Sequence, residues 1–133
     1  MWVKRTNNSG TQRLLSNKSS SSAAGFELYC SNNNNKRLTV KGTSQQRNRD
    51  VVNAWNAQNW HHIVSVFNGK AVLSNQRWRL FADGVQKDQN DIPKIEDGSG
   101  DLTLGASSST GSNRWIGQID DLRFYDRALS LSL

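Results

Sequence analysis

Short runs of apolar residues alternate along the chain with stretches rich in Ser, Asn, Asp and Gly. The runs favour β-branched and aromatic residues, which fit the pleated and half-buried surface of a sheet. No long segment keeps the spacing of an amphipathic helix. About eight short strands separated by turn signals predict an all-β protein, either an antiparallel β-sandwich or a barrel.

The predicted strands lie where apolar residues stand between turn formers. Segment 60–69 has apolar residues at both odd and even positions, which is typical of a central strand covered on both faces. Residues 43–59 are too polar for a buried strand and are expected to form a long loop or a short edge strand. The other strands are expected at 11–17, 25–30, 37–41, 76–84, 102–105 and 115–130, and the last is the longest.

A length of 133 residues is enough for a single domain over 1–133 with a core that needs no disulfide. The single cysteine, Cys30, excludes an internal disulfide and is expected to be a small buried residue of a strand. No apolar stretch approaches the roughly 20 residues of a membrane-spanning helix. The first residues do not form a signal peptide, so any export signal is expected to lie outside this chain.

Positive charge is concentrated in the first half of the chain. Residues 1–66 contain nine basic and two acidic residues, whereas 67–133 contain eight basic and nine acidic residues. The densest part comprises Lys36, Arg37, Lys41 and the stretch 47–49. Two interpretations stay open: a patch that attracts an anionic partner, or solvated edges and loops that keep the protein soluble.

Residues suited to catalysis are sparse. His61 and His62 are adjacent, so they point to opposite sides of a strand and cannot easily share one metal ion. The neighbouring Asp120 and Asp121 are separated in the same way, and with Asp126 they are expected to bond the backbone at turns and strand ends. No serine stands in a G-x-S-x-G context. The sequence therefore favours a protein that is not an enzyme.

Four motifs resemble, in their order and spacing, the concanavalin A-like lectin/glucanase superfamily and specifically its laminin-G-like jelly-roll domains. They are WHHIVSVFNG at 60–69, RLFADG at 79–84, LTLG at 102–105 and WIGQIDDLRFYDRALS at 115–130. The opening MWVKRTNNSGTQRLLSN is similar to an early strand of the family, so the resemblance covers nearly the whole chain. It implies an antiparallel jelly-roll β-sandwich and an extracellular or surface-exposed location.

The resemblance also implies how the last strand is placed. Within residues 116–125, the side chains of Ile119, Leu122 and Phe124 would lie in the core. This strand would pair with a strand near the N-terminus. Family members normally have a further strand or two before the WVK motif, so this partner is expected to be missing here. Because an unpaired edge is a template for another chain, we expect a homodimer through the open edge or an abbreviated domain.

Aromatic residues at apolar family positions are expected to be in the core, namely Trp2, Trp60 and Trp115. Trp78 shares its strand parity with Leu80, which also favours the core. His62, at the family spacing after a tryptophan, is expected to be a structural histidine whose ring bonds the backbone.

The resemblance does not extend to the catalysis of the glucanases. Those enzymes place two Glu and an Asp on alternate residues of one strand, whereas this chain has only Glu27 and Glu96, far apart. Laminin-G-like and pentraxin relatives often hold calcium through loop oxygens. Asp97, Ser99 and Asp101 offer oxygen ligands at alternate positions and form a candidate calcium site, with an ordinary hairpin turn as the alternative.

Trp55 stands in a polar loop and is the candidate platform for stacking a sugar ring, with a tryptophan that caps one end of the sandwich as the alternative. Asn53 and Asn56 could hydrogen-bond sugar hydroxyls, and Arg47 and Arg49 a sulfate or carboxylate. We therefore expect a non-catalytic, lectin-like carbohydrate-binding module, for which the basic half favours an anionic polysaccharide. The alternative is a protein-interaction or structural domain of a cell or virion surface. A nucleic-acid partner is not expected, because the basic half lacks interleaved aromatic residues.

Overall fold

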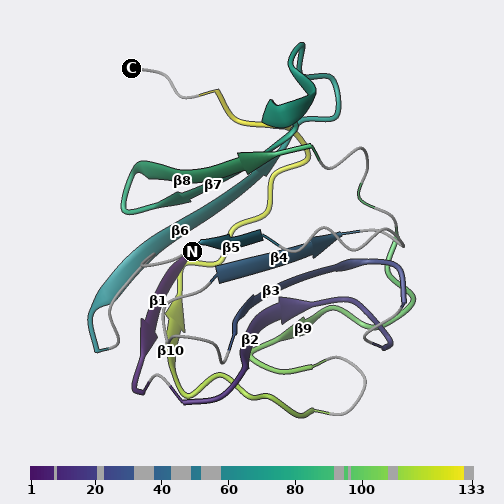
Figure 1. Ribbon diagram of the computed structural model, residues 1–133. Helices are drawn as coiled ribbons and strands as arrows, with labels where there is room; N and C mark the ends of the chain where they lie inside the picture. The colour runs from purple at the N-terminus through teal and green to yellow at the C-terminus, as the bar shows by residue number, and fades with distance from the viewer. Residues whose placement is uncertain are drawn as a thin grey trace.

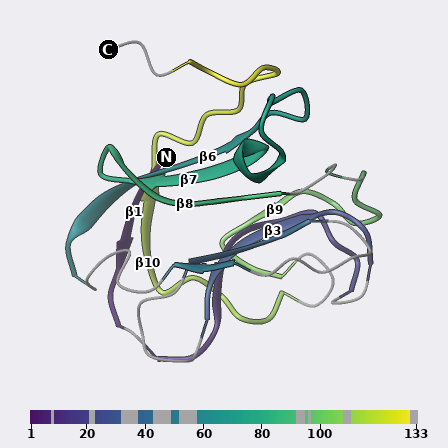
Figure 2. The same ribbon diagram turned by 45° about the horizontal axis from the view of Figure 1, so that its top comes forward.

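The computed structural model describes residues 1–7, 9–20, 23–31, 58–91, 95, 97–107 and 111–130, together with the backbone of 38–42 and 49–51. Within this part the strands form a sandwich of two five-stranded sheets that lie face to face (Figures 1 and 2). The neighbouring strands paired in each sheet are antiparallel. The all-β sandwich predicted from the sequence is confirmed.

The first sheet, called here the β6 sheet, has the order β10(Gly117–Asp120)-β1(Trp2–Arg5)-β6(Trp60–Phe67)-β7(Trp78–Ala82)-β8(Val85–Asn90). The second, the β3 sheet, has the order β5(Arg49–Val51)-β4(Leu38–Gly42)-β3(Phe26–Cys30)-β2(Gln12–Ser16)-β9(Thr103–Leu104). A short 3-10 helix, η1, spans Ser74–Gln76. None of the helices in the described residues is long and apolar enough to cross a membrane.

Alternate residues of the paired strands fill the space between the sheets. Ile63, Leu80 and Trp78 face inward from the β6 sheet, and all three are at most 2% exposed. Their counterparts on β2 and β3 include Leu28 and Cys30. The Trp78 ring nitrogen donates a hydrogen bond of 2.9 Å to the Ser65 hydroxyl, which satisfies its buried polar atom. The predicted core positions of Trp78 and Cys30 are confirmed.

Cys30 is expected to be chemically inert in the folded protein. Burial raises the pKa of its thiol to about 12, and the charge of Arg5 only partly opposes this shift. Because the thiolate is the reactive form, an aromatic disulfide reagent should modify the native protein far more slowly than the urea-unfolded protein at mildly alkaline pH. Absorbance of the released thiol measures both rates, and equal rates would contradict the buried placement of Cys30.

The strand expected to be missing beside the last strand is present. β1 pairs with β10 on one side, with Val3 opposite Ile119, and with β6 on the other, with Val3 opposite His61. The prediction of a missing partner was wrong because the WVK segment itself takes this position. Gly117 allows β10 to lie close to β1, since a Cβ at this residue would lie 1.9 Å from the Lys4 carbonyl oxygen.

The last strand is much shorter than the sequence predicted. β10 ends at Asp120, Asp121 has a positive φ of 49°, and the following residues to 130 form no strand. Ile119 packs against the core as expected, but Phe124 is 58% exposed, which corrects its predicted core position. Asp120 accepts a hydrogen bond from the backbone of Asp121, in agreement with its predicted role at a strand end.

Two tryptophans predicted for the core are half exposed, Trp2 at 41% and Trp60 at 42%. The parity of their strands explains this, because Trp2 alternates with the buried Val3 and Trp60 has the opposite parity to the buried Ile63. Trp115 does pack against the core. The His62 ring contacts the Trp2 ring, with 4.9 Å between ring centroids, and its expected hydrogen bond to the backbone stays a prediction.

Candidate functional site

A polar group, called here the Arg13 cluster, occupies the outer face of the β3 sheet and consists of Arg13, Ser16, Glu27 and Tyr29. Antiparallel pairing of β2 and β3 places Arg13 opposite Tyr29 and Ser16 opposite Glu27. Leu28 alternates with Glu27 and Tyr29 and belongs to the core, so these two residues face away from the core. The strand register thus brings the four side chains together.

The cluster is held by a buried ion pair. Arg13 Nε donates to Glu27 Oε1 at 3.3 Å, and the side chains are only 13% and 3% exposed. The Ser16 hydroxyl donates to the same carboxylate oxygen at 3.4 Å. The guanidinium carbon lies 5.5 Å from the centre of the Tyr29 ring, a cation–π contact that fixes the plane of the arginine.

Two polar atoms of this ion pair are left without partners. Arg13 Nη1 and Glu27 Oε2 are buried and make no hydrogen bond within the described part of the chain. Buried polar atoms are nearly always bonded, so these two atoms call for a further partner, such as a bound water, an ion or a ligand group. Together they offer a charged donor and a charged acceptor beside an aromatic ring. A charged donor and a charged acceptor match the carboxylate and the hydroxyl groups of an acidic sugar.

A further basic position adjoins the cluster through the sheet register. Lys41 on β4 lies opposite Glu27, and Thr39 lies opposite Tyr29. β5 continues the sheet outward, with Asp50 opposite Thr39. The basic stretch noted in the sequence therefore contributes strands to the same sheet as the Arg13 cluster.

Most of the sugar-site residues predicted from the sequence fall outside the described residues, namely Arg47, Asn53, Trp55 and Asn56. Arg49 is placed as the first residue of the edge strand β5. Their role in binding stays a prediction. Sequence analysis missed Arg13 and Glu27, although charged residues inside the apolar strands QRLLS and FELYC were a usable signal.

The predicted calcium loop packs onto the end of β2. The Gly100 backbone donates to the Asn17 carbonyl at 3.0 Å, and the Ser99 hydroxyl lies 2.6 Å from that of Ser19. Asp97 and Asp101 are exposed. Among the described residues, no group of three or more His, Cys, Asp or Glu side chains is arranged to hold a metal ion. Calcium binding at Asp97, Ser99 and Asp101 stays a prediction.

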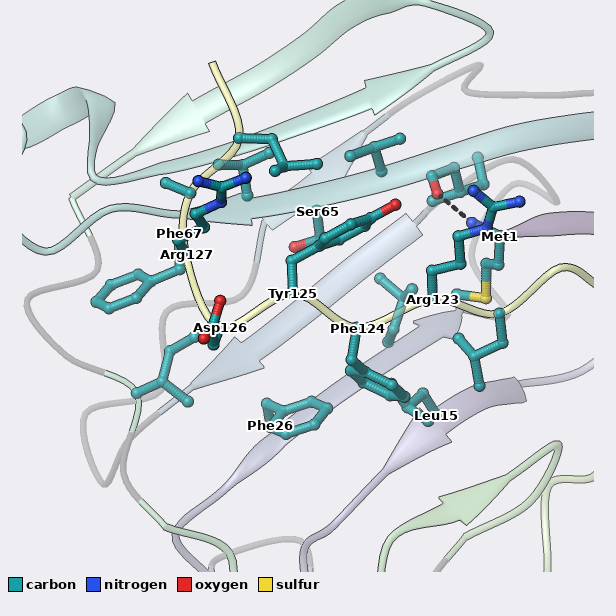
Figure 3. A pocket seen from close by; sticks show the side chains of 18 of the residues that line it. Met1, Leu15, Phe26, Ser65, Phe67, Arg123, Phe124, Tyr125, Asp126 and Arg127 are labelled. Carbon is teal, nitrogen blue, oxygen red and sulfur yellow. Dashed lines mark hydrogen bonds between the residues drawn. The ribbon is translucent and has the colours of Figure 1, made fainter. Parts of the chain in front are cut away.

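A hollow lies between the two sheets, a cavity of about 650 Å³ bordered by β6, by β2 and β3, and by the segment 121–129 (Figure 3). Phe124 points towards Phe26 and Leu15 in this view. Arg123 Nε donates to Asp121 at 2.7 Å, which raises the arginine pKa. The lining is mostly apolar, although Glu27 of the Arg13 cluster also borders the cavity.

A laminin G family model described as the concanavalin A-like lectin/glucanases superfamily matches residues 1–132. The chain belongs to this superfamily. The match confirms the family resemblance deduced from the four motifs. A search of curated proteins finds no significant sequence match to this chain.

Solved structures of similar fold include domains of sialidases. The Ruminococcus gnavus IT-sialidase CBM40 has a TM-score of 0.78 and 19% identity, with 98% of this chain and 75% of that chain covered. The same CBM40 bound to α2,3-sialyllactose has a TM-score of 0.75, with the same identity and coverage. A leech intramolecular trans-sialidase complexed with 2,7-anhydro-Neu5Ac has a TM-score of 0.72 and 21% identity. The match covers 98% of this chain and 21% of that chain. These likenesses establish the shared fold.

Proposed function

We propose that this superfamily member is a non-catalytic, lectin-like module that binds an anionic sugar through the Arg13 cluster. The observation that carries this proposal is the pair of buried atoms without partners, Arg13 Nη1 and Glu27 Oε2. In the proposed complex the guanidinium group binds the sugar carboxylate, and Glu27 accepts hydrogen bonds from hydroxyl groups. Tyr29 is buried and packs against the guanidinium group, which orients it.

The overall charge supports an anionic ligand. The formal net charge is +6, and the excess of basic residues lies in residues 1–66, which supply β2 to β5 of the β3 sheet as well as β1 and nearly all of β6. A positive field of this kind attracts anions and weakens as salt is added. The similar CBM40 bound to α2,3-sialyllactose makes a sialylated sugar the first ligand to test. An extracellular location fits such a ligand and belongs to the same proposal.

The proposed absence of catalysis rests on the arrangement of carboxylates. Glycosidases need two carboxyl groups that flank the scissile bond. None of the described strands carries two acidic residues at alternate positions, and Glu27 is held in its ion pair with Arg13. The Arg13 cluster can therefore hold a sugar but does not provide the acid and the nucleophile together.

Calorimetric titration of the protein with α2,3-sialyllactose tests the proposal, and titration with lactose provides the matched neutral sugar. We expect binding of the sialylated sugar that weakens at higher salt, and binding of lactose that is at least about tenfold weaker, because lactose lacks the carboxylate. Equal affinity for the two sugars would contradict recognition of the negative charge. Absence of heat with both, at protein concentrations suited to millimolar affinity, would overturn the proposal.

A further inference from the structure

Arg5 is a buried arginine at one end of the sandwich. It is the last residue of β1 and alternates with the core residue Val3, so its side chain turns inward, and Arg5 is only 1% exposed. Gln12, the first residue of β2, pairs at the same end with Cys30, the last residue of β3. We call this part of the interior the Arg5 end.

The guanidinium group of Arg5 is only partly bonded. Nη2 donates to the carbonyl oxygens of Ser9 and Gly10, at 3.3 and 2.8 Å. Nε and Nη1 are buried and have no hydrogen-bond partner within the described part of the chain. Ser31, which directly follows Cys30, has a buried hydroxyl that is also unbonded among the described residues. Three donors at the Arg5 end therefore lack an acceptor.

The polar groups nearest to Arg5 do not supply this acceptor. The Gln12 side-chain oxygen accepts from the Ile116 backbone at 3.0 Å, and its nitrogen donates to two other oxygens. The Cys30 thiol stays protonated at neutral pH, because burial raises its pKa to about 12. Neither group brings a negative charge to the guanidinium.

The positive charge of Arg5 also lacks a partner. Burial lowers the pKa of the guanidinium, and among the described residues only the Cys30 thiol opposes this shift, so no described carboxylate acts on it. The segments 32–37 and 52–57, which continue the chain beyond β3 and β5, contain no Asp or Glu. Arginine keeps its proton in proteins, and a buried charge is strongly disfavoured unless it is paired. A water molecule can bond Nε and Nη1 but does not balance the charge.

We propose that the Arg5 end binds a small monovalent anion, with chloride as the representative ligand. The anion would accept hydrogen bonds from Arg5 Nε and Nη1, and the Ser31 hydroxyl can turn towards the same acceptor. One unbalanced positive charge calls for one negative charge, and the burial of Arg5 excludes a bulky anion. This site is separate from the sugar site, because Arg5 faces the interior whereas the Arg13 cluster lies on the outer face of the β3 sheet.

Anion-dependent melting tests the proposal, because only the folded protein offers the site. At constant pH and ionic strength, the melting temperature should be about 3 °C or more higher in sodium chloride or bromide than in sodium isethionate, whose anion is too bulky. Arg5→Met removes the charge and should abolish this difference. Arg123→Gln, at an arginine whose side chain is 64% exposed, should keep it. Equal melting temperatures of the parent protein in the three salts would overturn the proposal.

Crystals grown in sodium bromide locate the anion. We expect an anomalous bromine peak within hydrogen-bond reach of Arg5 Nε and Nη1. This measurement uses the unaltered protein, so it decides the matter even if Arg5→Met does not fold. Peaks confined to exposed basic residues or to Arg13 would show an adventitious ion only and would overturn the proposal. A water molecule without anomalous signal at Nε and Nη1 would overturn it as well.

Discussion

Replacement of Gly117 by alanine is expected to destabilise the protein by about 2–5 kcal/mol, because a side chain at this position meets the neighbouring strand. Gly117 has a φ of 155°, which alanine rarely adopts. Its Cβ would also lie 1.9 Å from the Lys4 carbonyl oxygen and 3.0 Å from the Arg5 Cα, both on β1. Backbone atoms cannot move aside as a flexible side chain can, so β10 would separate from β1. Urea unfolding measures the loss.

Gly84→Ala is the matched control for this substitution. Gly84 also has a positive φ, of 76°, but no neighbouring atom lies within 4 Å of the place that a Cβ would take. Alanine there should cost only about 1–2 kcal/mol, the strain of a left-handed conformation. If both variants lose the same stability, the close contact between β10 and β1 is not the cause.

Replacement of Arg13 by glutamine is expected to weaken binding of α2,3-sialyllactose by about 10–100-fold, the loss of a hydrogen bond between charged groups. Glutamine keeps a polar side chain but removes the positive charge and the guanidinium fork. The ion pair with Glu27 and the contact with Tyr29 are lost at the same time. Calorimetric titration of folded variant and parent protein measures the difference.

Two further variants separate recognition by the Arg13 guanidinium group from a general effect of charge. Arg123→Gln removes the same charge from an arginine whose side chain is 64% exposed and which lies on the segment after β10, so it should leave sugar affinity nearly unchanged. Arg13→Lys keeps the charge but not the fork, and its affinity should fall between those of Arg13→Gln and the parent. A loss of affinity in Arg123→Gln as large as that in Arg13→Gln would point to a nonspecific charge effect.

The pattern of apolar residues was sufficient to predict the strands that fill the core. Trp78 was placed correctly because it shares its strand parity with Leu80, and Cys30 because a free thiol is usually a small buried residue. The segment 115–130 misled the prediction because its apolar residues continue past Asp120, while the backbone turns at Asp121, where φ is positive. Local composition does not indicate where a strand leaves its sheet.

The candidate site was harder to predict than the fold. Trp55 was favoured because an aromatic residue in a polar loop is an obvious binding feature in a sequence. Arg13 and Glu27 lie 14 positions apart and meet only through the pairing of β2 and β3. Their meeting arises from strand register, which residue types alone do not determine.

Chemical-shift mapping of the isotope-labelled protein during titration with α2,3-sialyllactose tests the central claim most directly. The account predicts that the largest shifts gather at Arg13, Ser16, Glu27 and Tyr29, including the Arg13 Nε–H signal, while Ser65 and Phe67 on β6 do not move. Shifts that gather at residues 47–59 instead, or nowhere, would contradict the assignment of the sugar site to the Arg13 cluster.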